Sequence, residues 1–210
     1  MKVKHLVGAC LCVLGCYACS SPKTEVQSPD GHIKMTLTID ENGKPFYNVS
    51  VDDSLLIENS AMGFTAANGI ILGEGFQVKN TTFSSEDETW TQPWGENKKN
   101  RNHYNEMAVN LTNEDHVKLT LRFRVFDDGI AFRYEYTVPT VDSLLITDEL
   151  TTFRFHRDGT SWSIPASAET YELLYQQQPI SEVETANTPF TFKTADGVYG
   201  SIHEAALYDF

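Results

Sequence analysis

Two runs of alternating apolar and polar residues constrain the fold of this chain more than any other feature of its sequence. Residues 117–125 place apolar side chains at every second position, with lysine, threonine and arginine between them. Residues 130–136 repeat the alternation, and Asp127-Asp128-Gly129 separates the two runs. Successive side chains of a strand point to opposite faces, so each run predicts a strand with one buried face. Aspartate and glycine favour tight turns, so the two runs are predicted to form a β-hairpin.

The rest of the chain carries the same kind of signal in shorter pieces. Asn42-Gly43 and Asp196-Gly197 are predicted to form tight turns. Helical periodicity is weak everywhere, and residues 168–178 come nearest to it. The glycine-rich residues 63–78 are expected to form irregular strands and connections. Further strands are predicted for residues 33–39, 47–51, 55–57, 153–155, 190–193 and 198–202. Many short strands separated by turn signals predict an all-β fold, a β-sandwich.

The charge and the cysteines narrow the class of protein. The 210 residues carry a formal net charge of -13, which excludes a nucleic-acid partner because phosphate binding needs clustered lysine and arginine. Neutral sugars and cations remain compatible with this charge. All four cysteines, Cys10, Cys12, Cys16 and Cys19, precede residue 20. The residues after them can form no disulfide among themselves, so the fold must depend on its hydrophobic core.

Residues 1–19 are predicted to be a lipoprotein-type signal peptide. Two early lysines precede an apolar run of about a dozen residues, which is too short to span a bilayer. Small residues before a cysteine suit a bacterial lipoprotein, with Cys19 or, in a competing register, Cys16 as the lipid attachment site. An ordinary cleaved signal peptide is the alternative. Residues 20–27 are then a polar tether. We expect an exported protein in the periplasm or at the outer membrane, associated with the membrane only through a lipid anchor.

Residues 88–106 combine aromatic rings with hydrogen-bonding groups in one short stretch. Trp90 and Trp94 lie among charged residues, and Pro93 and Gly95 interrupt regular structure. The stretch is therefore predicted to be a loop. One interpretation is a sugar-facing loop, because a pyranose offers an apolar face together with hydroxyl groups. The other interpretation is that the two tryptophans cover the open end of the hydrophobic core.

Four polar residues complete the candidates on the substrate side: Glu96, Arg101, His103 and Glu106. His103 and Glu106 would need a helix to bind one metal ion together, so a histidine held at an interface is the favoured interpretation. Arg101 is expected to pair with one of the two glutamates and to fix the loop. Residues 40–43 superficially resemble a calcium loop, but the glutamate required later in such a loop is absent and a turn is predicted instead.

A series of short motifs runs in order along the chain: Ser28-Pro29-Asp30-Gly31, Asp87-Glu88-Thr89-Trp90, Gln92-Pro93-Trp94-Gly95-Glu96, Asn102-His103-Tyr104-Asn105-Glu106, Phe123-Arg124-Val125-Phe126-Asp127-Asp128-Gly129, Phe132-Arg133-Tyr134-Glu135 and Ser201-Ile202-His203-Glu204-Ala205-Ala206-Leu207. Together they resemble the amino-terminal domain of glycoside hydrolase family 97. This family comprises calcium-dependent α-glucosidases and α-galactosidases of gut Bacteroides and their relatives. The resemblance covers nearly all of the chain after residue 27.

The resemblance implies a β-sandwich of the supersandwich, galactose-mutarotase-like type over residues 28–210, packed against a catalytic (β/α)8 barrel. A barrel needs roughly 250 residues, and this sequence supplies none after Phe210. The chain also stops among apolar residues, so we expect a domain that is cut short at its C-terminal end. The catalytic acid and base of the family belong to the barrel. The chain is therefore expected to contain no catalytic residue and to be inactive alone.

The resemblance also implies one metal ligand. The amino-terminal domain of the family lends a carboxylate to an active-site calcium, and the matching residue here is Glu204. The other ligands would come from the barrel, so Ca2+ binding is expected only when the barrel is present. The implied function is the N-terminal domain of an exo-acting α-glucosidase or α-galactosidase whose substrate is an α-linked oligosaccharide. The alternative is a stand-alone carbohydrate-binding lipoprotein.

Overall fold

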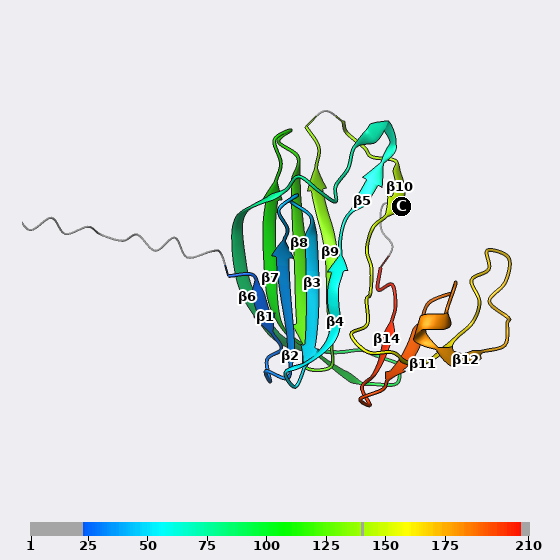
Figure 1. Cartoon of the computed structure of the whole chain (residues 1–210). Helices are drawn as coiled ribbons and strands as arrows, with labels where there is room; N and C mark the ends of the chain where they lie inside the picture. The colour runs from blue at the N-terminus through cyan, green and yellow to red at the C-terminus, as the bar shows by residue number, and fades with distance from the viewer. Residues whose placement is uncertain (1–22, 140, 207–210) are drawn as a thin grey trace, which may run out of the picture.

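The computed structural model describes residues 23–139 and 141–206, and in this part the regular structure is almost entirely β. Two four-stranded antiparallel sheets dominate it, each with its strands in sequential order. The first contains β1 (Glu25–Gln27), β2 (Ile33–Ile39), β3 (Pro45–Val51) and β4 (Ser54–Ala61). The second contains β6 (Gln77–Thr91), β7 (Lys99–Thr112), β8 (Lys118–Phe126) and β9 (Gly129–Thr137). Figure 1 shows the two sheets packed face to face, which confirms the predicted β-sandwich.

Two smaller sheets complete the described part of the chain. β5 (Phe64–Ala66) pairs with β10 (Ile146–Glu149) in the first of them. The second has the strand order β12 (Gln176–Pro179), β11 (Gly159–Ser163), β13 (Phe190–Thr194) and β14 (Tyr199–Ile202). The short 3-10 helices η1 (Ala67–Gly69) and η2 (Ile180–Glu182) lie between strands. Because Glu204 follows β14 within two residues, this last sheet positions the predicted metal ligand.

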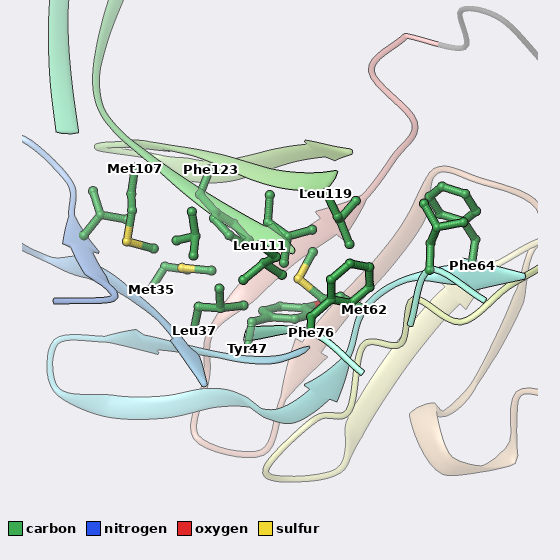
Figure 2. Close-up of a cluster of buried hydrophobic side chains, with 14 of the residues drawn as sticks. Met35, Leu37, Tyr47, Met62, Phe64, Phe76, Met107, Leu111, Leu119 and Phe123 are labelled. Carbon is green, nitrogen blue, oxygen red and sulfur yellow. The ribbon is translucent and has the colours of Figure 1, made fainter. Parts of the chain in front are cut away.

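The hydrophobic core lies between the two large sheets. β8 faces it with the side chains of residues 119, 121, 123 and 125, all of which are completely inaccessible to solvent. β2 and β3 supply opposing side chains that include Met35, Leu37 and Tyr47 (Figure 2). The alternation of the sequence therefore predicted correctly which face of β8 is buried. A fully buried aliphatic side chain of this kind stabilises the fold by about 1.5–3 kcal/mol.

The turn predicted at Asn42-Gly43 joins β2 to β3. The Asp40 carboxylate accepts hydrogen bonds from the backbone N–H groups of Asn42 at 2.9 Å and Lys44 at 2.8 Å, which fixes the turn. Gly43 has a φ of +73°, and a Cβ atom there would lie 2.3 Å from the backbone nitrogen of Phe76. Only glycine lets the chain pass so closely. Asp40 therefore organises the turn that was predicted here.

The predicted strand at residues 153–155 is wrong in detail. Phe155 makes an isolated bridge with Ile57 instead of a continuous ladder. A side chain replaces a backbone acceptor nearby, because the Oγ of Ser60 accepts a hydrogen bond of 2.8 Å from the N–H of Arg154. The segment runs beside β4 as its apolar residues indicated, but this side-chain contact interrupts the regular backbone pairing.

The N-terminal side of the domain also differs from the sequence-based expectation. β1 pairs with β2 and buries Val26, so residues 25–27 belong to the first sheet and not to the tether that we expected over residues 20–27. The predicted signal peptide and the candidate lipid sites Cys16 and Cys19 lie outside the described residues.

Residues 168–178 contain no helix. No helix in the described part of the chain has the length and apolar character needed to cross a membrane.

The substitution Leu121→Ala tests the assignment of the core. Leu121 is completely buried on β8, so its truncation removes buried methyl groups and leaves a cavity. We expect the free energy of unfolding to fall by about 3 kcal/mol. The matched control is Leu174→Ala, whose side chain is 90% exposed and whose loss should cost less than about 0.5 kcal/mol. Urea unfolding followed by circular dichroism measures both, and equal losses would contradict this core.

Candidate functional site

Residues 88–106 form a hairpin, so the predicted loop is wrong. β6 continues to Thr91 and β7 begins at Lys99, directly opposite it. Pro93 and Gly95 occupy only the connecting residues between these two strands. Pairing along two long strands therefore outweighs the local signals that break regular structure. Those signals determine where the chain turns and not whether the flanking residues are β.

The hairpin extends beyond its sheet as a two-stranded arm. The third strand, β8, ends at Phe126 opposite Tyr104. Asp87 to Thr91 on β6 and their partners on β7 therefore have no paired strand on the β8 side within the described residues, and we call residues 87–103 the hairpin arm. Arg101 fixes the arm by donating two hydrogen bonds of 2.8 Å to the carboxylate of Asp87.

Both tryptophans of the hairpin arm are exposed. Trp90 on β6 is 50% exposed and Trp94 in the turn is 86% exposed. Glu96 in the same turn is exposed as well. These exposed fractions contradict the interpretation that the two rings cover the open end of the core. The sugar-facing interpretation stays a prediction, with the rings now placed on a hairpin.

His103 and Glu106 lie three positions apart on β7, so their side chains point to opposite faces of the sheet and do not converge on one ion. The Nδ1 atom of His103 lies 3.6 Å from Oδ2 of Asp127 in the β8–β9 turn. This contact connects the hairpin arm to the end of the sandwich. Arg101 is engaged with Asp87, so the expected pairing of Arg101 with Glu96 or Glu106 is wrong.

Glu106 anchors a network of charges on the outer face of the second sheet. The register of β7 and β8 places Arg124 directly opposite Glu106, and its Nε donates a hydrogen bond of 2.8 Å to Oε2. Arg122, two residues earlier on β8, donates to the other carboxylate oxygen, Oε1. Arg122 also donates to both oxygens of Glu135 on β9, at 2.8 and 3.1 Å. Arg133 makes a second ion pair with Glu135.

The network is a structural feature of the sheet. The hydrogen bonds from Arg122 are the main reason why the pKa of Glu135 falls to about 2. Burial alone would raise the pKa of Glu106, but the two arginines outweigh burial and lower it. The sequence analysis named Glu106 as a candidate site residue but not its partners Arg122, Arg124 and Glu135, although two of these stand in the quoted motifs. Extending the register of the predicted hairpin from its turn places Arg133 opposite Arg122 and Glu135 on the diagonal, within reach of the long arginine side chain.

Glu204 lies just beyond β14, and its side chain is exposed. One carboxylate oxygen, Oε2, accepts a hydrogen bond of 2.9 Å from the hydroxyl of Thr188. Within residues 23–139 and 141–206, no three His, Cys, Asp or Glu side chains gather as a metal site. Calcium takes 6–8 oxygen ligands. Glu204 can supply a hard oxygen ligand, and no cluster of further His, Cys, Asp or Glu side chains surrounds it within the described residues.

The fold defines the class of protein. It is a β-sandwich of two antiparallel sheets with a small additional sheet, and the exposed Glu204 lies just after the last strand of that sheet. Residues 26–210 match the family model described as Glycosyl-hydrolase 97 N-terminal. This match spans most of the sequence, so the chain belongs to the glycoside hydrolase family 97 N-terminal domains. The resemblance noted in the sequence motifs is confirmed.

Solved structures support the same assignment. A glycoside hydrolase family 97 enzyme from Pseudoalteromonas sp. strain K8, in complex with panose, has 37% sequence identity and a TM-score of 0.81. The alignment covers 89% of this chain and 29% of that chain, and the acarbose complex of the enzyme gives the same values. A β-arabinopyranosidase, with 24% identity and a TM-score of 0.77 over 87% of this chain and 31% of that one, shares the fold.

A curated relative agrees with these structures. The chain is 30% identical over 133 residues to a retaining alpha-galactosidase of Bacteroides thetaiotaomicron. That match covers 63% of this chain and 19% of the relative. The chain therefore spans about a fifth of the curated relative and less than a third of the Pseudoalteromonas enzyme.

The pKa of Glu135 predicts how stability depends on pH. Arg122 lowers this pKa from 4.5 to about 2 in the folded protein. The ion pair between Arg122 and Glu135 therefore contributes fully to the free energy of unfolding above pH 4.5. This contribution is lost as the pH falls toward 2. We expect Glu135→Gln to reduce the free energy of unfolding at pH 6, and the difference from the wild type to shrink steadily between pH 4.5 and 2.

The matched control for this experiment is Glu114→Gln, in the exposed β7–β8 turn. No described residue makes an ion pair with Glu114. Chemical unfolding at a series of pH values measures all three proteins. A difference between Glu135→Gln and wild type that is independent of pH would contradict the assigned ion pair.

Proposed function

We propose that this chain is the N-terminal domain of a calcium-dependent, exo-acting α-glycosidase. It packs against a (β/α)8 barrel, lends Glu204 to a calcium ion at the active site, and helps to close the pocket for an α-linked oligosaccharide. The observation that carries the proposal is an exposed glutamate within the family's Ser-Ile-His-Glu-Ala motif, with one of its carboxylate oxygens free of any hydrogen bond from the described residues.

The relatives support an α-glycoside as the substrate. The Pseudoalteromonas enzyme was solved with panose and with acarbose, and the Bacteroides relative is named a retaining alpha-galactosidase. The substrate of the complete protein is accordingly an α-glucoside or an α-galactoside. The choice between them depends on residues that a catalytic barrel would supply.

The chemistry of Glu204 suits calcium. Ca2+ is a hard cation that accepts carboxylate oxygens from separate chain segments. When bound, it can polarise the oxygens of a sugar substrate. Glu204 would supply one ligand, from the end of β14, and the barrel would supply the others. The chain alone is therefore proposed to bind calcium weakly.

We propose a division of labour in which the barrel supplies the catalytic carboxylates and this domain supplies none. Hydrolysis of a glycoside requires two carboxylates that flank the scissile bond. Glu106 is engaged by two arginines, and we assign neither catalytic carboxylate to this domain. We further propose that the protein is exported through residues 1–19 and lipid-anchored at Cys19, or at Cys16 in the competing register.

The substitution Glu204→Ala tests the proposed calcium ligand in a protein that joins this chain to its catalytic barrel. Removing one carboxylate from the shell should weaken calcium binding by at least about tenfold, judged by the effects of supporting ligands in metal sites. Activity on an aryl α-glycoside should fall in parallel and recover partly at high calcium. Isothermal titration calorimetry measures the affinity. The control is Glu184→Ala, an exposed glutamate in a connecting segment, which should change neither quantity.

Calcium dependence that is the same in Glu204→Ala and in the wild type would reject Glu204 as a ligand. Hydrolysis of an aryl α-glycoside by the purified 210-residue chain would reject the proposed division of labour. The two results are independent, because the first concerns the metal and the second concerns the catalytic carboxylates.

The exposed tryptophans favour a second candidate function, a carbohydrate-binding lipoprotein that acts without a barrel. Trp94 is 86% exposed at the tip of the hairpin arm, where its ring can stack on the apolar face of a sugar. This candidate predicts that the isolated chain releases heat on titration with a maltooligosaccharide or a galactoside at millimolar concentration. Trp94→Ala should abolish the signal, and Tyr199→Ala, which removes an exposed ring on β14, should preserve it. No heat from the wild type would exclude this candidate.

A further inference from the structure

The last sheet places a hydroxyl group directly beside Glu204. β13 and β14 are antiparallel, and their register pairs Phe190 with Ile202 at the end of the ladder. Continuing the register by two residues brings Thr188 opposite Glu204. The structure shows this contact, since the Thr188 Oγ1 atom lies 2.9 Å from Glu204 Oε2. The contact lies just beyond the end of the ladder, between the residues that lead into β13 and out of β14.

The backbone on the β13 side is itself anchored. Pro189 separates Thr188 from the first residue of β13, and proline has no N–H group to continue the ladder. Asn187, which precedes Thr188, donates its backbone N–H to the carbonyl of Ile164 at 3.0 Å. Thr188 is therefore held between a hydrogen bond on one side and a strand on the other.

The hydrogen bond makes the two oxygens of the Glu204 carboxylate different in their surroundings. Oε2 accepts from Thr188, whereas no described residue donates to Oε1. A long exposed glutamate samples several side-chain rotamers unless a partner restricts it. A hydroxyl donor that fixes one oxygen and leaves the other available is the arrangement that supporting residues provide around metal ligands.

We infer that Thr188 is a positioning residue for the metal ligand Glu204. It holds Oε2 so that the carboxylate is already oriented when the cation binds. The inference rests on the proposed function, because it takes Glu204 as a calcium ligand. Thr188 itself acts through Glu204.

The test compares Thr188→Val with Thr188→Ser in a protein that joins this chain to its catalytic barrel. Valine keeps the shape of threonine and removes the hydroxyl, whereas serine keeps the hydroxyl. Calorimetric titration with CaCl2 gives the affinity, and thermal unfolding in EGTA checks the fold without metal. We expect Thr188→Val to weaken calcium binding about tenfold, Thr188→Ser to stay within about twofold of wild type, and the melting temperatures in EGTA to be unchanged.

A double variant separates action through Glu204 from a direct effect. If Thr188 works only by orienting the carboxylate, Glu204→Ala with Thr188→Val should bind calcium as Glu204→Ala does. Further weakening in the double variant would overturn the inference. Should Thr188→Val fail to fold, Thr188→Ala replaces it in the same cycle.

The outcomes distinguish the inference from the proposed function. Weaker binding in Glu204→Ala with unchanged binding in Thr188→Val would overturn only the role of Thr188. Unchanged binding in Glu204→Ala would overturn the proposed calcium ligand, and the role of Thr188 with it. Loss of affinity in both Thr188→Val and Thr188→Ser would also overturn the inference, because serine retains the hydroxyl.

Discussion

The packing of β2 and β3 against β7 and β8 is the interaction on which the rest of this structure depends. No cysteine lies after Cys19, so no cross-link can hold the two sheets together. The inward side chains of β8 are completely buried, and they complete a core with the opposing side chains of the first sheet (Figure 2). At about 25 cal/mol per Å2 of buried apolar area, such a core is the dominant stabilising contribution.

The core also determines where the last sheet lies. Tyr47 donates its hydroxyl to the carbonyl of Thr152 at 2.8 Å, and its ring packs on Phe153 with centroids 6.4 Å apart. Two residues later, Phe155 packs on Phe192 of β13 with centroids 4.6 Å apart. These contacts form a chain from the centre of the sandwich to the strand beside β14. The position of Glu204 is thus connected to the core through aromatic side chains.

Much of the fold could be predicted from the sequence because its signals are local. The alternation over residues 117–136 fixed a hairpin and its buried face, and Asn42-Gly43 fixed a turn that only glycine allows. The hairpin arm was missed because its evidence is not local. Its strand pairing extends as far as Thr91 opposite Lys99, and a short window around Pro93 shows only the residues that break strands.

In the candidate site, too, the residues with local sequence signals were predicted and those brought together only by the fold were not. Glu204 was found through a motif, whereas its partner Thr188 is 16 residues away in the sequence and comes close to it only in the folded chain. The arginines that engage Glu106 were missed for a similar reason. They lie on the neighbouring strand β8, and the register that brings them to Glu106 could not be read from a stretch that was predicted to be a loop.

A comparison of the two glutamates explains why one can serve a cation and the other cannot. Glu106 is 7% exposed, and arginines bond both of its oxygens. A cation near it would have to displace these bonds and would be repelled by both guanidinium groups. Glu204 is exposed, and among the described residues it is held by a neutral hydroxyl at one oxygen only. It can therefore accept a cation at its free oxygen while the hydroxyl keeps its orientation, and it lies at a strand end where another domain can reach it.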